Sequence, residues 1–94
     1  MRNSKEDKKF INSLHGYRTV RYERENEVIN SEGRINVTWK KFVIISKNKI
    51  IFEAKKDELF IGRLMSGDGI RIKGFNLETN QEDSLTVYFS YFAY

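Results

Sequence analysis

Apolar side chains recur at every second position along most of this chain. In one such segment, Ile70 and Ile72 fall on one side, while the other side carries Arg71, Lys73 and Phe75. Successive side chains of an extended strand point to opposite faces, so a segment of this kind has one face for the core and one for water. The pattern predicts antiparallel strands with one solvated face.

Residues typical of tight turns separate the alternating segments. Lys47-Asn48 is suited to a two-residue hairpin loop, and the glycine-rich stretch from Ser66 to Gly69 allows positive φ at several positions. Five or six strands are therefore expected, over residues 17–24, 34–46, 50–54, 59–64, 70–75 and 84–94.

The longest of these runs, 34–46, is interrupted by two lysines. If its alternation were regular, Lys41 would lie on the same side as Trp39, so we expect a β-bulge at Lys40 and Lys41 that bends the strand. The polar stretch 25–33 is predicted to be a loop with at most brief strand pairing, and 76–84 is predicted to be an acidic loop.

The first residues follow a helical period instead. Phe10, Ile11 and Leu14 share one face of a helix over roughly 4–15, and Gly16 can take the left-handed conformation that ends a helix. The chain is therefore expected to be a single α+β domain over 1–94. Its short N-terminal helix would precede a mainly antiparallel sheet that curls or closes into a small barrel.

Composition argues against common catalytic sites. The chain has no cysteine and one histidine, His15, which we interpret as a residue that caps or packs the end of the helix. Neither a thiolate metal site nor a Ser-His-Asp arrangement is predicted, and we expect no enzyme activity, cofactor or metal. The absence of cysteine, the polar N-terminus and the lack of a long apolar stretch favour a cytoplasmic protein without membrane contact.

Charge is unevenly distributed along the sequence. The net charge is +4, and residues 35–75 hold nine basic and four acidic side chains, whereas residues 76–94 hold three acidic side chains and no basic ones. A basic surface can steer polyanions, and cations beside aromatic rings suit single-stranded nucleic acid. The predicted steering or nucleic-acid surface consists of Lys40, Lys41, Arg71, Lys73 and Phe75.

The C-terminal segment 84–94 is uncharged and rich in aromatic residues. As a strand, it would place Leu85 and Val87 on a core face and Tyr88, Phe92 and Tyr94 on the other face. These three rings would be core if both faces are covered, and a protein-partner surface if they are not. At a sheet edge, the same strand could also pair with a copy of itself to form a homodimer.

One short motif resembles part of an enzyme site. Glu53 and Lys55, after an apolar strand, are similar to the end of a metal-dependent nuclease motif in which the acid holds magnesium and the lysine stabilises charge at the attacked phosphate. The acid that such a motif needs on a neighbouring strand would have to be Glu25, Glu27 or Glu32.

Three functions follow from these features. We expect a non-catalytic regulator or inhibitor that engages a protein partner, such as a component of a nucleic-acid-handling machine in the manner of small phage or mobile-element proteins. The alternatives are direct binding of single-stranded RNA or DNA and, from Glu53 and Lys55, a metal-dependent nuclease.

Overall fold

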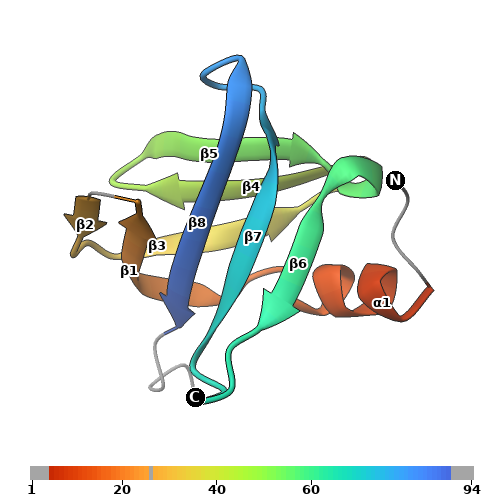
Figure 1. Cartoon of the computed structure of the whole chain (residues 1–94), viewed down its shortest axis with the longest axis horizontal. Helices are drawn as coiled ribbons and strands as arrows, with labels where there is room; N and C mark the ends of the chain where they lie inside the picture. The colour runs from red at the N-terminus through yellow and green to blue at the C-terminus, as the bar shows by residue number, and fades with distance from the viewer. Residues whose placement is uncertain (1–4, 26, 90–94) are drawn as a thin grey trace.

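A computed structural model describes residues 5–25 and 27–89 of this chain (Figure 1). Within these ranges, one α-helix precedes a sheet of eight antiparallel strands, with a single turn of 3-10 helix, η1, between two of them. The expected helix and antiparallel sheet are confirmed, but the sheet has more strands than predicted. The elements are α1 (Lys5–Ser13), β1 (Arg18–Arg24), β2 (Glu27–Ile29), β3 (Gly33–Val37), β4 (Lys41–Ser46), β5 (Lys49–Lys55), η1 (Lys56–Glu58), β6 (Phe60–Arg63), β7 (Gly69–Asn76) and β8 (Gln81–Phe89).

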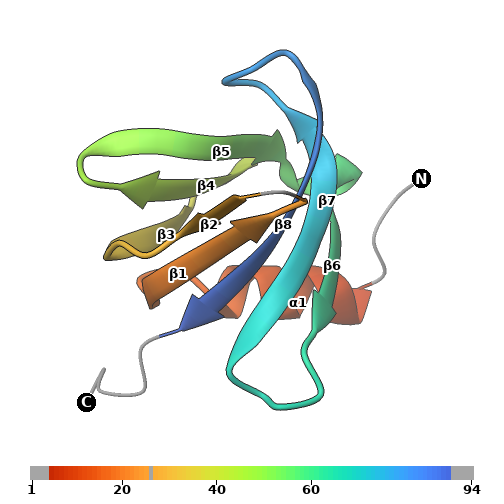
Figure 2. The ribbon, with the colours of Figure 1, turned by 60° about the vertical axis from the view of Figure 1, so that its left-hand side comes forward.

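The sheet is strongly curled. Its strand order is β5-β4-β3-β1-β8-β7-β6, and β2 pairs with β1 beside this path. Figure 1 shows β7 and β8 crossing in front of β3, β4 and β5, and Figure 2 shows the two groups of strands from another side, so the sheet folds over onto itself. No strand ladder joins β5 to β6 within the described part of the chain. The curled sheet is therefore confirmed, and closure into a barrel is not.

The run 34–46 forms two strands, so the predicted bulge at Lys40-Lys41 is wrong. The ladder between β3 and β4 ends at the pair Val37 and Phe42, and the backbone N–H of Thr38 donates to the Lys41 carbonyl at 2.9 Å. Trp39 and Lys40 form the loop of this hairpin. Because the chain reverses here, the Trp39 side chain never has to share a strand face with Lys41. This split, together with the short strand β2, accounts for the additional strands.

The other predicted hairpin turns are confirmed. Lys47 and Asn48 have φ of 52° and 63°, as a two-residue loop that follows the twist of its strands requires. The predicted acidic loop 76–84 is shorter than expected, because β7 extends to Asn76 and β8 begins at Gln81. Only residues 77–80 form the turn, so the acidic residues of β8 belong to the sheet.

A single cluster of buried apolar side chains fills the curled sheet. The predicted inner residues of β7 and β8 are buried, as are Ile11 and Leu14 from α1, while Phe10 is half-buried against the cluster. The cluster consists of Ile11, Leu14, Tyr22, Ile35, Phe42, Ile44, Phe52, Ala54, Leu59, Ile70, Ile72, Leu85 and Val87.

No helix in the described ranges is both long and apolar enough to cross a membrane.

Candidate binding surface

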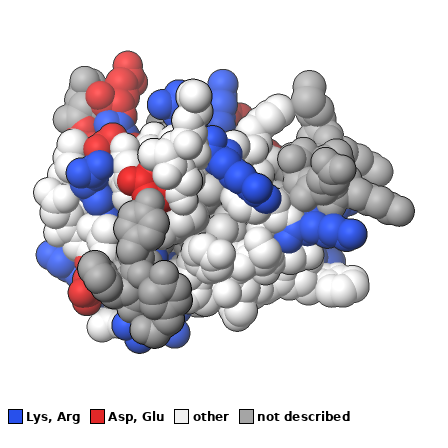
Figure 3. All heavy atoms as spheres, turned by 90° about the horizontal axis from the view of Figure 1, so that it is seen from below, with Lys and Arg blue, Asp and Glu red and all other residues white. Residues whose placement is uncertain are grey.

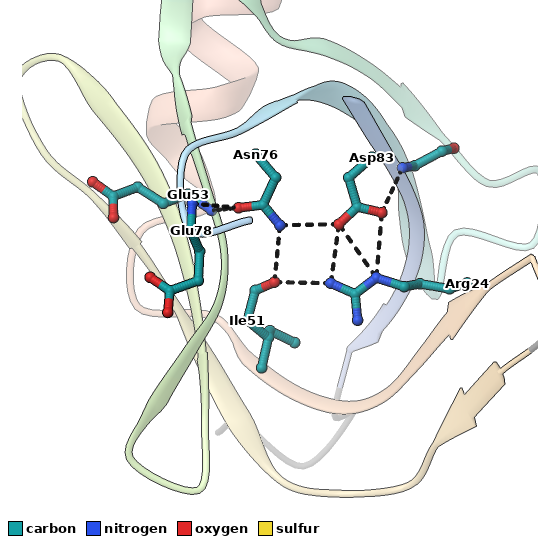
Figure 4. Close-up of polar contacts among 7 residues, drawn as sticks. Arg24, Ile51, Glu53, Asn76, Glu78 and Asp83 are labelled. Carbon is teal, nitrogen blue, oxygen red and sulfur yellow. Dashed lines mark hydrogen bonds and ion pairs between the residues drawn. The ribbon is translucent and has the colours of Figure 1, made fainter. Parts of the chain in front are cut away.

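A polar cluster fills the end of the curled sheet that lies near the β7–β8 turn (Figure 4). The Arg24 guanidinium donates from Nε to both oxygens of Asp83 at 3.2 Å, and from Nη2 to Asp83 Oδ2 at 3.0 Å and to the Ile51 carbonyl at 2.9 Å. Asn76 Nδ2 donates to Asp83 Oδ2 at 3.0 Å and to the same Ile51 carbonyl at 3.2 Å. We call Arg24, Asn76 and Asp83 the polar clamp.

The polar clamp also covers the free edge of β5. Asn76 Oδ1 accepts the backbone N–H of Glu53 at 3.2 Å and that of Glu78 at 3.0 Å, and the Leu77 N–H donates to the Glu53 carbonyl at 2.7 Å. These contacts join β5 to β7 without a strand ladder. Because the Ile51 carbonyl and both backbone groups of Glu53 already have partners, this part of the β5 edge is closed to another strand.

The Asp83 carboxylate is held in its charged form. Its side chain is 14% exposed, and this burial acts to raise its pKa. Hydrogen bonds from Arg24 and Asn76 and the charge of Arg24 outweigh burial, so the pKa of Asp83 lies below its ordinary value of 3.8. The clamp therefore fixes β1, β7 and β8 relative to one another at neutral pH.

The strands β6, β7, β8 and β1 share one solvated side, which we call the outer face. It includes Phe60, Arg71, Lys73, Phe75, Ser84, Thr86 and Tyr88. Arg71 and Lys73 are exposed on β7, as predicted, and no carboxylate in the described ranges lies within 4.0 Å of either cation. Phe60 stands opposite Lys73 in the ladder and is 49% exposed, and Phe75 is 40% exposed. The face therefore places two unpaired cations beside two accessible phenyl rings.

The neighbouring strands contribute short polar side chains. Ser84 of β8 stands opposite Lys73, and Thr86 stands opposite Arg71. Gly62 of β6 faces Arg71 from the other side. Arg71 therefore has small ladder neighbours on both sides, and Lys73 has one on its β8 side.

Tyr88 lies on the outer face, but its ring and its hydroxyl already contact other residues of the protein. The Arg21 guanidinium carbon is 3.9 Å from the centroid of the Tyr88 ring, and the tyrosine hydroxyl donates to Glu23 Oε1 at 3.3 Å. Arg21 also forms an ion pair with Glu23, with 3.3 Å between Nε and Oε2. The side predicted for Tyr88 is thus correct, although its ring is half-buried by these contacts. The other two predicted partner residues, Phe92 and Tyr94, lie outside the described residues.

β8 is an interior strand of the sheet. It pairs with β7 on one side and with β1, from Thr86 to Phe89, on the other. A homodimer built by strand pairing along this part of β8 would therefore have to displace β1 or β7.

A shallow groove of about 610 Å³ runs over β7, β8 and β1 on the outer face. Its β7 side carries Arg71 and Lys73, while Glu23, Glu25 and Glu82 line other parts of it. Arg24 and Asp83 of the clamp also line it. The groove thus offers both signs of charge to a ligand rather than one.

The other predicted basic residues lie at the β3–β4 hairpin. Lys40 is exposed, and Lys41 forms an ion pair with Glu53, with 2.8 Å between Nζ and Oε2. The sequence pattern missed Trp39, which is 88% exposed in the hairpin loop, because it was assigned to a continuous strand. The pattern also missed Phe60, whose position opposite Lys73 depends on the strand register.

Glu53, the acid of the nuclease-like pair, does not belong to a metal-binding cluster among the described residues. The Glu53 carboxylate binds Lys41, and no group of three His, Cys, Asp or Glu side chains in residues 5–25 and 27–89 is placed to hold a metal ion. Glu25, Glu27 and Glu32 are therefore not gathered with Glu53 into such a group.

Known proteins give no further indication. No family model, curated protein or solved structure matches this chain. The function has to be inferred from the surface itself.

Figure 3 shows one side of that surface, where lysines and arginines are spread around a largely uncharged centre.

Proposed function

We propose that this chain is a non-catalytic binding protein that engages a protein partner through its outer face and acts as a regulator or inhibitor. The observation that carries the proposal is the pair Arg71 and Lys73, which lack ion-pair partners in the described chain and lie beside the exposed rings of Phe60 and Phe75. Protein interfaces are enriched in aromatic residues and arginine, whose burial supplies much of the binding energy.

The charge pattern favours a protein over a polyanion. A nucleic-acid strand that contacted Arg71 and Lys73 along the groove would also approach the carboxylates that line it, Glu23, Glu25 and Glu82. A protein surface can present acidic groups to the β7 side and basic groups to the other side. Such complementarity sets orientation and association rate more than affinity. The aromatic rings are therefore expected to supply most of the affinity.

Rigidity also supports the outer face as a binding surface. Its side chains stand on paired strands, and the polar clamp ties three of those strands together. Binding residues on fixed strands lose little conformational freedom when a partner docks. In this proposal Lys40, exposed at the β3–β4 hairpin, contributes only to long-range steering.

Direct binding of single-stranded nucleic acid is the second candidate. Phe60 and Phe75 could stack on bases while Arg71 and Lys73 contact phosphates. A nucleic-acid strand that lay over β6 and β7 would stay further from the acidic side of the groove. This mode predicts affinity that falls steeply as salt is added.

Capture from a native lysate, with and without nuclease treatment, separates these two functions. We expect the wild-type protein to retain a discrete protein after nuclease treatment, and both Arg71→Ala/Lys73→Ala and Phe60→Ala/Phe75→Ala to lose it. Lys9→Ala/Lys55→Ala is the control, because it removes the same charge as the first variant from exposed positions elsewhere. Loss of the captured protein on nuclease treatment, together with a shift of a labelled oligonucleotide at low salt, would favour the nucleic-acid function instead.

A further inference from the structure

A second groove, of about 680 Å³, crosses β1 and β3 and reaches the β4–β5 turn. Its lining differs in charge from that of the outer face. Arg18, Arg34 and Lys47 line it, and Glu32 is the only carboxylate among its lining residues in the described chain. The sequence patterns did not single out this groove, because its residues come from three separate segments.

Two arginines face each other in this groove. Arg18 of β1 and Arg34 of β3 are direct partners in the antiparallel ladder, and both are exposed. Like charges at directly opposed positions destabilise a sheet. No carboxylate in the described ranges lies within 4.0 Å of either guanidinium. Nothing within the described protein therefore offsets this repulsion by an ion pair.

The backbone around the two arginines is well fixed. The Gly16 N–H donates to the Ile35 carbonyl at 2.8 Å, and the Ile35 N–H donates to the Tyr17 carbonyl at 2.9 Å, so the residues next to both arginines are held together. Lys47 is in the tight turn at the end of β4. The backbone positions that carry these cations are thus set by the fold before any ligand arrives.

His15 adds a hydrogen-bond donor at the edge of the groove. Its Nδ1 accepts the backbone N–H of Val37 at 2.8 Å, so the ring proton is on Nε2 in this arrangement. Together with the side-chain amide of Asn48, the lining offers hydrogen-bond donors as well as charge. This combination suits an oxyanion.

We propose that this groove binds a phosphate group, with Arg18 and Arg34 on either side of it. Guanidinium groups bind phosphate oxygens through paired N–H donors, and a bound anion would offset the repulsion between the arginines. The phosphate could come from a small phosphorylated compound or from a nucleic-acid strand, which present the same chemistry. The site is independent of the protein-partner surface, since neither arginine lines the outer-face groove.

Calorimetric titration and thermal unfolding with two probes test the proposal. The probes are inorganic pyrophosphate and a short oligothymidylate, each compared with sodium chloride at the same ionic strength. We expect at least one probe to bind and to raise the melting temperature, because a ligand that binds only the folded state stabilises it. Arg18→Gln/Arg34→Gln should weaken that binding by about tenfold for each arginine lost, as expected for hydrogen bonds to charged groups.

Two further variants make the test specific. Lys9→Gln/Lys55→Gln removes the same charge outside the groove and should leave binding unchanged, whereas Glu32→Gln should tighten it by removing the one competing carboxylate. Glu32→Gln also provides the test if the double arginine variant fails to fold. Pyrophosphate binding alone would indicate a small phosphorylated ligand, and tighter, strongly salt-dependent oligothymidylate binding would indicate a nucleic-acid strand. Failure of both probes to bind, or binding that ignores Arg18, Arg34 and Glu32, would overturn the proposal.

Discussion

The two ends of the curled sheet are closed by different chemistry. Figures 1 and 2 place α1 near one end and the β7–β8 turn at the other. At the helix end, Ile11 and Leu14 are buried in the apolar cluster. At the other end, the polar clamp of Arg24, Asn76 and Asp83 bonds β1, β7 and β8 to the edge of β5.

This difference predicts how each end responds to change. Apolar packing depends on buried area and volume, so it tolerates substitution by an apolar side chain of similar volume. A hydrogen-bonded cluster depends on every member, because removing one leaves the others buried without partners. The polar end is therefore expected to be the more sensitive one, and it also supports the strands that carry the outer face.

The largest effect is expected at Asn76. Its side chain is fully buried and bonds to Asp83, to the Ile51 carbonyl and to the N–H groups of Glu53 and Glu78. Asn76→Leu keeps a similar volume but takes the acceptor from the Glu53 and Glu78 N–H groups. It also takes one of two side-chain donors from Asp83 and from the Ile51 carbonyl, which keep Arg24. We expect it to lower the free energy of unfolding by about 4 kcal/mol. Urea unfolding measures this. A loss below that of Leu14→Ala would contradict the greater sensitivity of the polar end.

The apolar end should show a smaller but clear loss. Leu14 is buried where α1 meets the core, and Leu14→Ala removes apolar contacts and leaves a cavity. We expect about 3 kcal/mol less stability by urea unfolding, near the lower part of the range for buried leucines. Leu14→Met is the matched control and should cost less than about 1.5 kcal/mol, since it conserves volume.

Acid should weaken the polar end through Asp83. Because the pKa of Asp83 is lower in the folded protein than its ordinary value of 3.8, its contribution to stability is fully present above that value. The contribution is lost as the pH falls through the lowered pKa, and the loss should be smaller than that from Asn76→Leu.

Asp83→Asn isolates this effect, because the asparagine side chain does not titrate. The stability difference between wild type and Asp83→Asn should be largest near neutral pH and should shrink below about pH 4. Urea unfolding of both proteins over the same pH series measures the difference. A gap that stays constant to low pH would show that Asp83 does not act through its charge.

The smallest effect on stability is expected on the outer face. Arg71→Ala/Lys73→Ala removes exposed cations that make no ion pair in the described chain, so the free energy of unfolding should change by no more than about 0.5 kcal/mol. Thermal and urea unfolding check this. A large loss would mean that these residues hold the fold, and would remove the reason to assign them to binding.

The sequence predicted the elements better than their connections. Alternation found β7 and the inner side of β8, and turn chemistry found Lys47-Asn48, because both signals are local. The split of 34–46 was missed because the Trp39-Lys40 loop has neither glycine nor proline to mark it. Strand order and the open edge depend on long-range pairing, which no local pattern contains.

The candidate surface was only partly accessible to sequence reasoning. Arg71, Lys73 and Phe75 share a strand, so their common face followed from alternation. Phe60 joins them only through the ladder between β6 and β7, and Arg24 meets Asp83 across 59 positions of sequence. Arg18 faces Arg34 in the same way, through a register that the sequence does not state.

Site-specific photo-crosslinking tests the proposed partner surface most directly. A benzophenone analogue of phenylalanine is placed at Phe75 on the outer face and, in a matched protein, at the exposed aromatic position Trp39 in the β3–β4 hairpin. We expect a discrete, nuclease-resistant protein adduct from position 75 in native lysate, and a much weaker one from position 39. Adducts to nucleic acid at position 75, or a protein adduct only from position 39, would contradict it.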